Sequence, residues 1–168
     1  AFNSYIMGQF INSNGVITES SAGIMINNRS FRYGDGLFES IRIANHRPQF
    51  LKEHLKRLLV GMQVLKMQPN PLLHESYLEV AILELAQKND IGGGGRVRLT
   101  VYRNDGGLYT PESNEVSFFI EVDALEDDNY LLNAKGYTID LFSEFKKQQN
   151  ILSNIKSANS ILYVLASI

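Results

Sequence analysis

The fold is decided by residues 37–65, which read LFESIRIANHRPQFLKEHLKRLLVGMQVL. Residues 37–43 form a short, mostly apolar run that predicts a strand, and the turn at 45–48 predicts a hairpin. After residue 50 the hydrophobic period becomes helical. The apolar stripe of this predicted helix is made by Leu51, Leu55, Leu58, Leu59, Met62 and Leu65. Pro69 and Pro71 end the helix, because proline cannot continue one.

The flanking sequence extends this pattern of strands and helices. Residues 4–50 are predicted to be strands throughout, with Asn14-Gly15 as a hairpin signal. A second amphipathic helix is predicted around residues 78–85, and two more strands at 96–102 and 115–123. Because strands and helices occur in runs, the predicted fold is α+β. Its first domain has a mostly antiparallel sheet and two helices.

Four glycines, Gly92 to Gly95, stand between the second helix and the next strand. A phosphate cradle is one interpretation, but no Lys-Ser/Thr pair and no predicted helix follow. We favour a loose connection.

An acidic stretch at residues 126–129 is the predicted linker. A strand is predicted to begin again at 136–142, and Ser153 or Asn154 is expected to cap a final helix from Ile155 onward. We therefore expect an N-terminal α/β domain at 1–125, a linker at 126–135 and the start of a C-terminal domain at 136–168. The final helix has no stop signal, so we expect this second domain to be truncated.

The composition excludes several classes of protein. Hydrophobic residues make up 44% of the 168 residues, charged residues 20%, and the net charge is −2. These values are typical of a soluble globular protein and favour neither nucleic acid nor membrane as a partner. The absence of cysteine excludes a disulfide framework, a thiol nucleophile and a thiolate metal site. We expect no metal site, and a cytoplasmic location.

Lys156 has the most suggestive surroundings. On the predicted final helix it shares one face with Asn159, Ser160 and Tyr163, whereas the opposite face is apolar. Only a neutral amine attacks a carbonyl, and an apolar neighbourhood favours that form. The residues alone leave open that Lys156 is an ordinary solvated lysine.

Three blocks of sequence resemble the class IV aminotransferases, in the family's order. They are RSFRYGDGLFESIR at 29–42, similar to the first strand block, FLKEHLKRL at 50–58, similar to the helix block, and SNIKSAN at 153–159, similar to the lysine motif. The resemblance runs from about residue 5 to residue 168. It implies a two-domain, fold-type IV enzyme with pyridoxal 5′-phosphate, a homodimeric assembly, and further cofactor contacts from a second domain.

The resemblance also implies roles for single residues. Lys156 would be the catalytic residue and would hold the cofactor as a Schiff base, and Arg57 would bind the cofactor phosphate. Tyr33 and Phe38 would face the substrate, and Arg98 lies on a strand that leads to substrate-carboxylate contacts. Structural interpretations also stay open. Tyr33 could be a packed aromatic residue, and Arg57 and Arg98 could be surface arginines. His54 is either a structural histidine or a residue that orients Arg57.

Some positions depart from parts of the family. Leu108 stands near the place where D-amino-acid aminotransferases and some lyases have arginine, and Ile161 replaces a tyrosine common in branched-chain enzymes. Glu39 resembles the usual residue of aminotransferases, whereas some lyases have threonine there.

The resemblance therefore implies an aminotransferase that moves an amino group between a branched-chain-like amino acid and a 2-oxo acid. The alternatives are a 4-amino-4-deoxychorismate lyase that releases pyruvate, and an inactive fragment.

Overall fold

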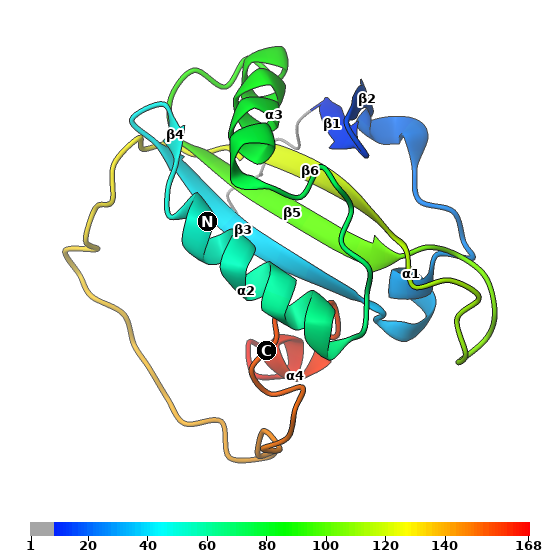
Figure 1. Cartoon of the computed structure of the whole chain (residues 1–168). Coiled ribbons are helices and arrows are strands. Elements are labelled where there is room, and N and C mark those ends of the chain that lie inside the picture. The colour runs from blue at the N-terminus through cyan, green and yellow to red at the C-terminus, as the bar shows by residue number, and fades with distance from the viewer. Residues whose placement is uncertain (1–8) are drawn as a thin grey trace.

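The computed structural model describes residues 9–168 and is built around one six-stranded sheet. The strand order is β2-β1-β6-β5-β3-β4, and every pair of neighbours is antiparallel. Figure 1 shows the long strands crossing the centre of the molecule. The strands are β1 (Phe10–Ser13), β2 (Val16–Glu19), β3 (Gly36–Ala44), β4 (Arg47–Pro48), β5 (Gly95–Arg103) and β6 (Val116–Ala124). The helices are η1 (Ser20–Ala22), α1 (Arg29–Tyr33), α2 (Leu51–Val64), α3 (Glu75–Lys88) and α4 (Ile161–Leu165).

The β1–β2 hairpin turns at Asn14-Gly15, as the sequence predicts. Ser13 pairs with Val16, and the two turn residues have φ angles of 50° and 94°. Positive φ at both central positions is the geometry for which Asn-Gly is favoured, because glycine has no Cβ to clash. The beginning of the predicted first strand, up to residue 8, lies outside the described residues.

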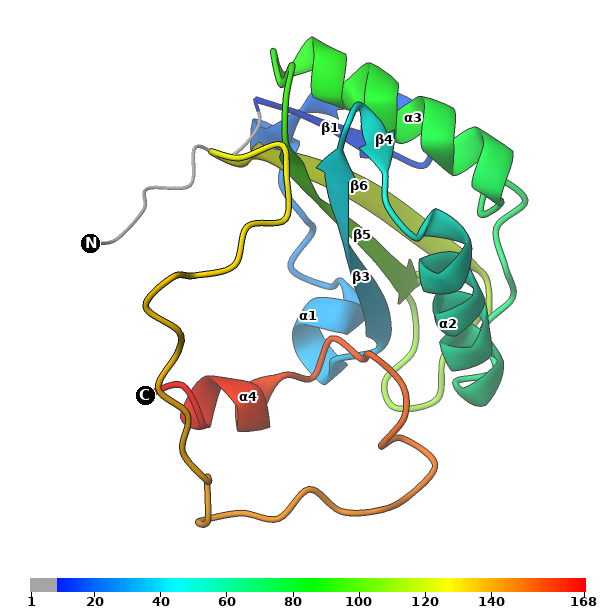
Figure 2. The same cartoon turned by 90° about the vertical axis from the view of Figure 1, so that its left-hand side faces the viewer.

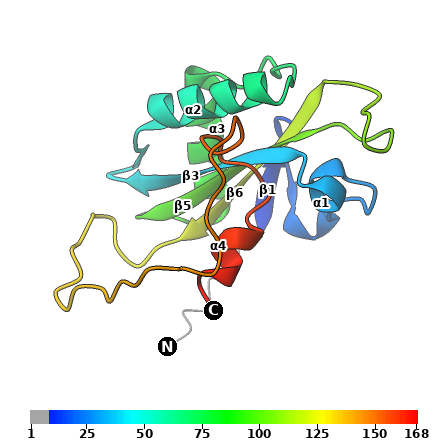
Figure 3. The same cartoon turned by 90° about the horizontal axis from the view of Figure 1, so that it is seen from below.

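The core lies between one face of the sheet and the helices α2 and α3, which Figure 3 shows above the strands. Alternate strand residues point to this face, because successive side chains of a strand point to opposite sides. The fully buried members include Leu37, Ile41, Val97, Leu99, Val101, Phe118 and Ile120 from the strands, with Leu58, Met62, Leu78, Ile82 and Leu85 from the helices. Both helices predicted by the 3.6-residue period are therefore confirmed, and so is the antiparallel sheet.

The prediction of strands throughout residues 4–50 is wrong at α1. The Asn28 side chain accepts a hydrogen bond from the backbone N–H of Phe31 and caps the helix start. Gly34, at φ 67°, ends the helix in the left-handed conformation. A helix of little more than one turn is too short to show a periodic signal, so its two caps are the only sequence trace of it.

The predicted structure after residue 135 is also wrong in two places. Residues 136–142 form no strand, and the predicted helix from Ile155 is reduced to the five residues of α4. Residues 155–158 instead extend along β3, where Leu37 bridges to Ser157. The Phe38 N–H donates to the Lys156 carbonyl at 3.0 Å, and the Ala158 N–H donates to the Gly36 carbonyl at 2.8 Å. The free sheet edge supplies these backbone partners, so edge pairing replaces the first helical turns.

The start of the predicted linker is attached to the sheet. Arg42 Nη2 donates to the carbonyls of Asp127 and Asn129, at 2.6 and 2.7 Å. A Cβ on Gly94 would lie 2.1 Å from the Asp127 carbonyl oxygen, so the four-glycine turn leaves room for this segment. Residues 125–154 contain neither helix nor strand, and Figure 2 shows much of this stretch as a long loop away from the sheet. The division into two domains stays a prediction.

Within residues 9–168, no helix is both long enough and apolar enough to cross a membrane.

The fully buried Ile82 provides a test of the core. We expect Ile82→Ala to lower the free energy of unfolding by about 2–5 kcal/mol, because it leaves a cavity under α3. Urea denaturation followed by circular dichroism measures the change. Val80→Ala on the same helix is the control, since Val80 is 54% exposed and should change stability little. Equal losses in both variants would contradict this packing.

Candidate active site

The edge of β3 brings Lys156 beside Phe38. The backbone pairing between residues 155–158 and β3 fixes the lysine next to the strand, and its Nζ lies 4.2 Å from the centre of the Phe38 ring. Lys156 therefore does not stand on a helix, and the predicted helical face shared with Asn159 and Tyr163 is wrong. The sheet edge gives the lysine its position instead.

Arg57 reaches the same place from helix α2. It lines a cavity of about 700 Å³ together with Lys156 and Phe38, and we call this space the Lys156 cavity. Other residues on its wall include Lys147, Asn154, Asn159 and Tyr163. Three predicted site residues thus come from three separate segments, β3, α2 and residues 155–158, and meet at one cavity. Its size is that of common small-molecule sites.

Glu39 also belongs to this arrangement. From the sequence alone, it serves only to compare the aminotransferases of the family with its lyases. It is 1% exposed, on the helix-covered face of β3. Its Oε1 accepts a hydrogen bond from Arg57 Nε at 2.8 Å, and its Oε2 accepts one from Arg57 Nη2. The hydrogen bonds that Arg57 donates to Glu39 raise the pKa of Arg57, against the smaller opposite effect of burial. A carboxylate in an apolar strand, followed by a helix rich in basic residues, is the signal that could have revealed this pair.

His54 completes the cluster around Glu39. Its Nδ1 lies 2.8 Å from Glu39 Oε2 and 3.1 Å from Arg57 Nη2. His54 and Arg57 are three residues apart on α2, so they project from the same side of the helix.

Arg98 lies on the sheet face that α2 and α3 leave uncovered. Its guanidinium carbon is 3.9 Å from the centre of the Phe38 ring, and its Nε is 4.0 Å from Glu121 Oε2. Burial lowers the pKa of Arg98, and the nearby Glu121 opposes that shift. Arg98 therefore contacts Phe38, but it does not line the Lys156 cavity.

Tyr33 lines a second, smaller cavity of about 370 Å³. Its ring centre is 5.6 Å from that of Tyr109, and the guanidinium of Arg29 lies over it at 5.1 Å. Ser157 and Asn159 line both cavities, so the lysine-bearing segment separates them. Tyr33 is thus a neighbour of the Lys156 cavity and not part of its wall. Leu108, which stands near the place where D-amino-acid aminotransferases and some lyases have arginine, is 73% exposed.

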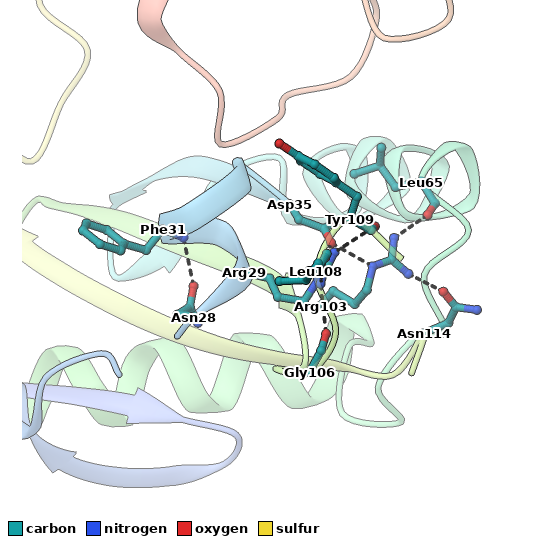
Figure 4. A network of polar contacts seen from close by, with 10 residues as sticks. All are labelled: Asn28, Arg29, Phe31, Asp35, Leu65, Arg103, Gly106, Leu108, Tyr109 and Asn114. Carbon is teal, nitrogen blue, oxygen red and sulfur yellow. Dashed lines mark hydrogen bonds and ion pairs between the residues drawn. The ribbon is translucent and has the colours of Figure 1, made fainter. Parts of the chain in front are cut away.

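A network of polar contacts holds the loop that carries Tyr109, as Figure 4 shows. Asp35 Oδ2 accepts from Arg29 Nε at 2.9 Å and from Arg103 Nε at 3.0 Å. Arg29 Nη1 also donates to the carbonyls of Gly106 and Leu108, at 2.9 and 2.6 Å. Both arginines are buried, at 3% and 6% exposure, so the single carboxylate between them is their charge partner.

The Asp35 network gives a second prediction. Asp35→Asn leaves Arg29 and Arg103 facing each other without a countercharge, so we expect a loss of about 3 kcal/mol in unfolding free energy. We also expect faster proteolysis in the loop at 105–111. Urea denaturation and limited proteolysis with mass spectrometry measure the two effects. Asp105→Asn, on the same loop but exposed, is the control. Wild-type stability in Asp35→Asn would overturn this role.

Comparisons with known proteins agree with this arrangement. A family model described as amino-transferase class IV matches residues 36–168. The search of curated proteins found no significant match. Among solved structures, the branched-chain aminotransferase of Thermoproteus uzoniensis with norvaline is 19% identical, with a TM-score of 0.61 over 70% of this chain and 41% of that one. The Escherichia coli branched-chain amino acid aminotransferase is 20% identical, with a TM-score of 0.60 over 70% of this chain and 40% of that one.

A third similar structure is a T.th. branched-chain amino acid aminotransferase with pyridoxamine 5′-phosphate. It is 25% identical, with a TM-score of 0.61 over 71% of this chain and 41% of that one. The chain thus spans 40–41% of the length of these proteins. The likenesses confirm the predicted fold class, that of the N-terminal part of a fold-type IV enzyme.

Proposed function

This chain belongs to the class IV aminotransferase family, and on that premise we propose that its protein moves an amino group between a branched-chain-like amino acid and a 2-oxo acid. The proposed cofactor is pyridoxal 5′-phosphate. The observation that carries the proposal is the meeting of Lys156, Arg57 and Phe38 at one cavity. Similar structures that are branched-chain aminotransferases support the choice of substrate class.

The residues around the cavity fit this cofactor. An aldehyde requires a primary amine, which Lys156 supplies, and a phosphate requires cationic hydrogen-bond donors, which Arg57 supplies. The Arg57 side chain is half exposed, and its hydrogen bonds to Glu39 and His54 use Nε and Nη2. Within the described part of the chain, Nη1 is therefore open to a ligand. Phe38 adds an apolar surface beside the amine.

The mechanism assigns one task to each residue. When bound, pyridoxal phosphate supplies a ring that accepts electrons from the carbanion of the amino acid. Lys156 Nζ would hold the cofactor through its aldehyde carbon, and as a free amine it would move the α-proton of the substrate. Arg57 would bind the phosphate and so orient the ring. Arg98, beside Phe38, is the proposed cation for the substrate carboxylate, and Tyr33 is the proposed outer wall of the substrate site.

Reductive labelling tests Lys156. We expect pyridoxal phosphate followed by borohydride to modify Lys156 selectively, as measured by peptide mass spectrometry. Lys156→Arg should remove that label. Lys147→Arg is a matched control, because Lys147 lines the same cavity while its Nζ contacts the Tyr163 hydroxyl at 2.9 Å. Selective labelling of Lys147, with Lys156 unmodified, would refute the assignment.

A further inference from the structure

Glu39 is an unusual residue for its position, since it is a carboxylate within the apolar core. Its neighbours on the same face of β3, Leu37 and Ile41, are each 1% exposed, as Glu39 is. Removing a carboxylate from water is costly unless charged or hydrogen-bonding partners replace the solvent. Arg57 provides the positive charge, and His54 provides a further polar contact from the same side of α2. The contact between Glu39 and Arg57 therefore fixes the arginine side chain on a rigid base formed by a central strand and a helix.

The way in which Glu39 holds Arg57 leaves a defined part of the guanidinium available. A guanidinium is planar and has five N–H groups in a fixed fork. Glu39 occupies the edge formed by Nε and Nη2. The remaining edge, which carries Nη1, must point away from Glu39 because the group is rigid. Arg57 lines the Lys156 cavity, and its side chain is 50% exposed.

We propose that Glu39 is a positioning residue that aims the free edge of Arg57 at the cofactor phosphate. The inference rests on the proposed function, in which Arg57 binds that phosphate. A flexible arginine would have to lose its rotamer freedom when the phosphate arrives. An arginine already fixed by a buried carboxylate has lost it during folding, so more of the interaction energy remains for binding.

The test isolates recognition of the phosphate from folding and from the reaction of the amine. The rate of borohydride-trapped labelling at Lys156 is measured with pyridoxal phosphate and with pyridoxal, which lacks the phosphate. Each rate is divided by that of a free lysine derivative with the same aldehyde. The ratio of the two normalised rates is the phosphate preference. Circular dichroism of each variant checks that it is folded.

Glu39→Gln keeps the size of the side chain but removes its charge and weakens its hold on both nitrogens. We expect it to lower the phosphate preference by roughly threefold to tenfold, the effect of having to immobilise one long side chain that is no longer held in place before binding. Labelling with pyridoxal should stay as in the wild type. Glu53→Gln, the same charge change at an exposed position of α2, should alter neither rate. In an Arg57→Ala background, Glu39→Gln should have no further effect.

Other results would overturn the inference in separate ways. If Arg57→Ala removes the phosphate preference and Glu39→Gln leaves it unchanged, Glu39 does not position the arginine, although the proposed function stands. If Glu39→Gln slows labelling by both aldehydes equally, its role is structural only. If Arg57→Ala leaves the preference intact, the phosphate role of Arg57 fails, and the inference fails with it.

Discussion

The site depends on one unpaired length of strand edge. One edge of β3 pairs with β5 along most of its length, but at the other edge β4 pairs only with Ile43 and Ala44. The opposite end of that edge, at Gly36 to Phe38, therefore has backbone donors and acceptors without a strand partner. Leaving such groups without hydrogen bonds is costly. The segment at 155–158 satisfies them. The lysine is consequently fixed by main-chain pairing to the strand that also carries Phe38 and Glu39.

The parts of the fold that can be predicted from the sequence are those whose structure is set by local residues. The helices α2 and α3 bury a wide apolar stripe, so their period is visible in the residues themselves. The β1–β2 turn is visible because Asn14-Gly15 suits positive φ. Helix α1 is too short to have a period. Residues 155–158 look helical in the sequence, but their conformation is decided by a distant strand edge that no local pattern describes.

The sequence predicts the candidate site for partly wrong reasons. The helical face that singles out Lys156 does not exist, and the resemblance to the lysine motif is the sounder ground. Arg57 and Phe38 follow from the resemblance, and they do lie at the Lys156 cavity, whereas Tyr33 and Arg98 lie beside it. The place of Glu39 is hidden in the sequence, because its burial and its partners depend on tertiary packing. The roles of these residues, the homodimer and the lyase alternative stay predictions.

The long exposed segment at 130–154 is attached to β3 at both ends, near Arg42 on one side and at Phe38 on the other. These two residues are four positions apart, or about 13 Å along a strand at about 3.3 Å per residue. The segment therefore works as a tether, and its length sets the effective concentration of the lysine at the strand edge. A cut within it would turn an intramolecular contact into a bimolecular one that two main-chain hydrogen bonds and a few side-chain contacts would have to maintain. The position of the reactive amine is thus a property of chain continuity as much as of packing.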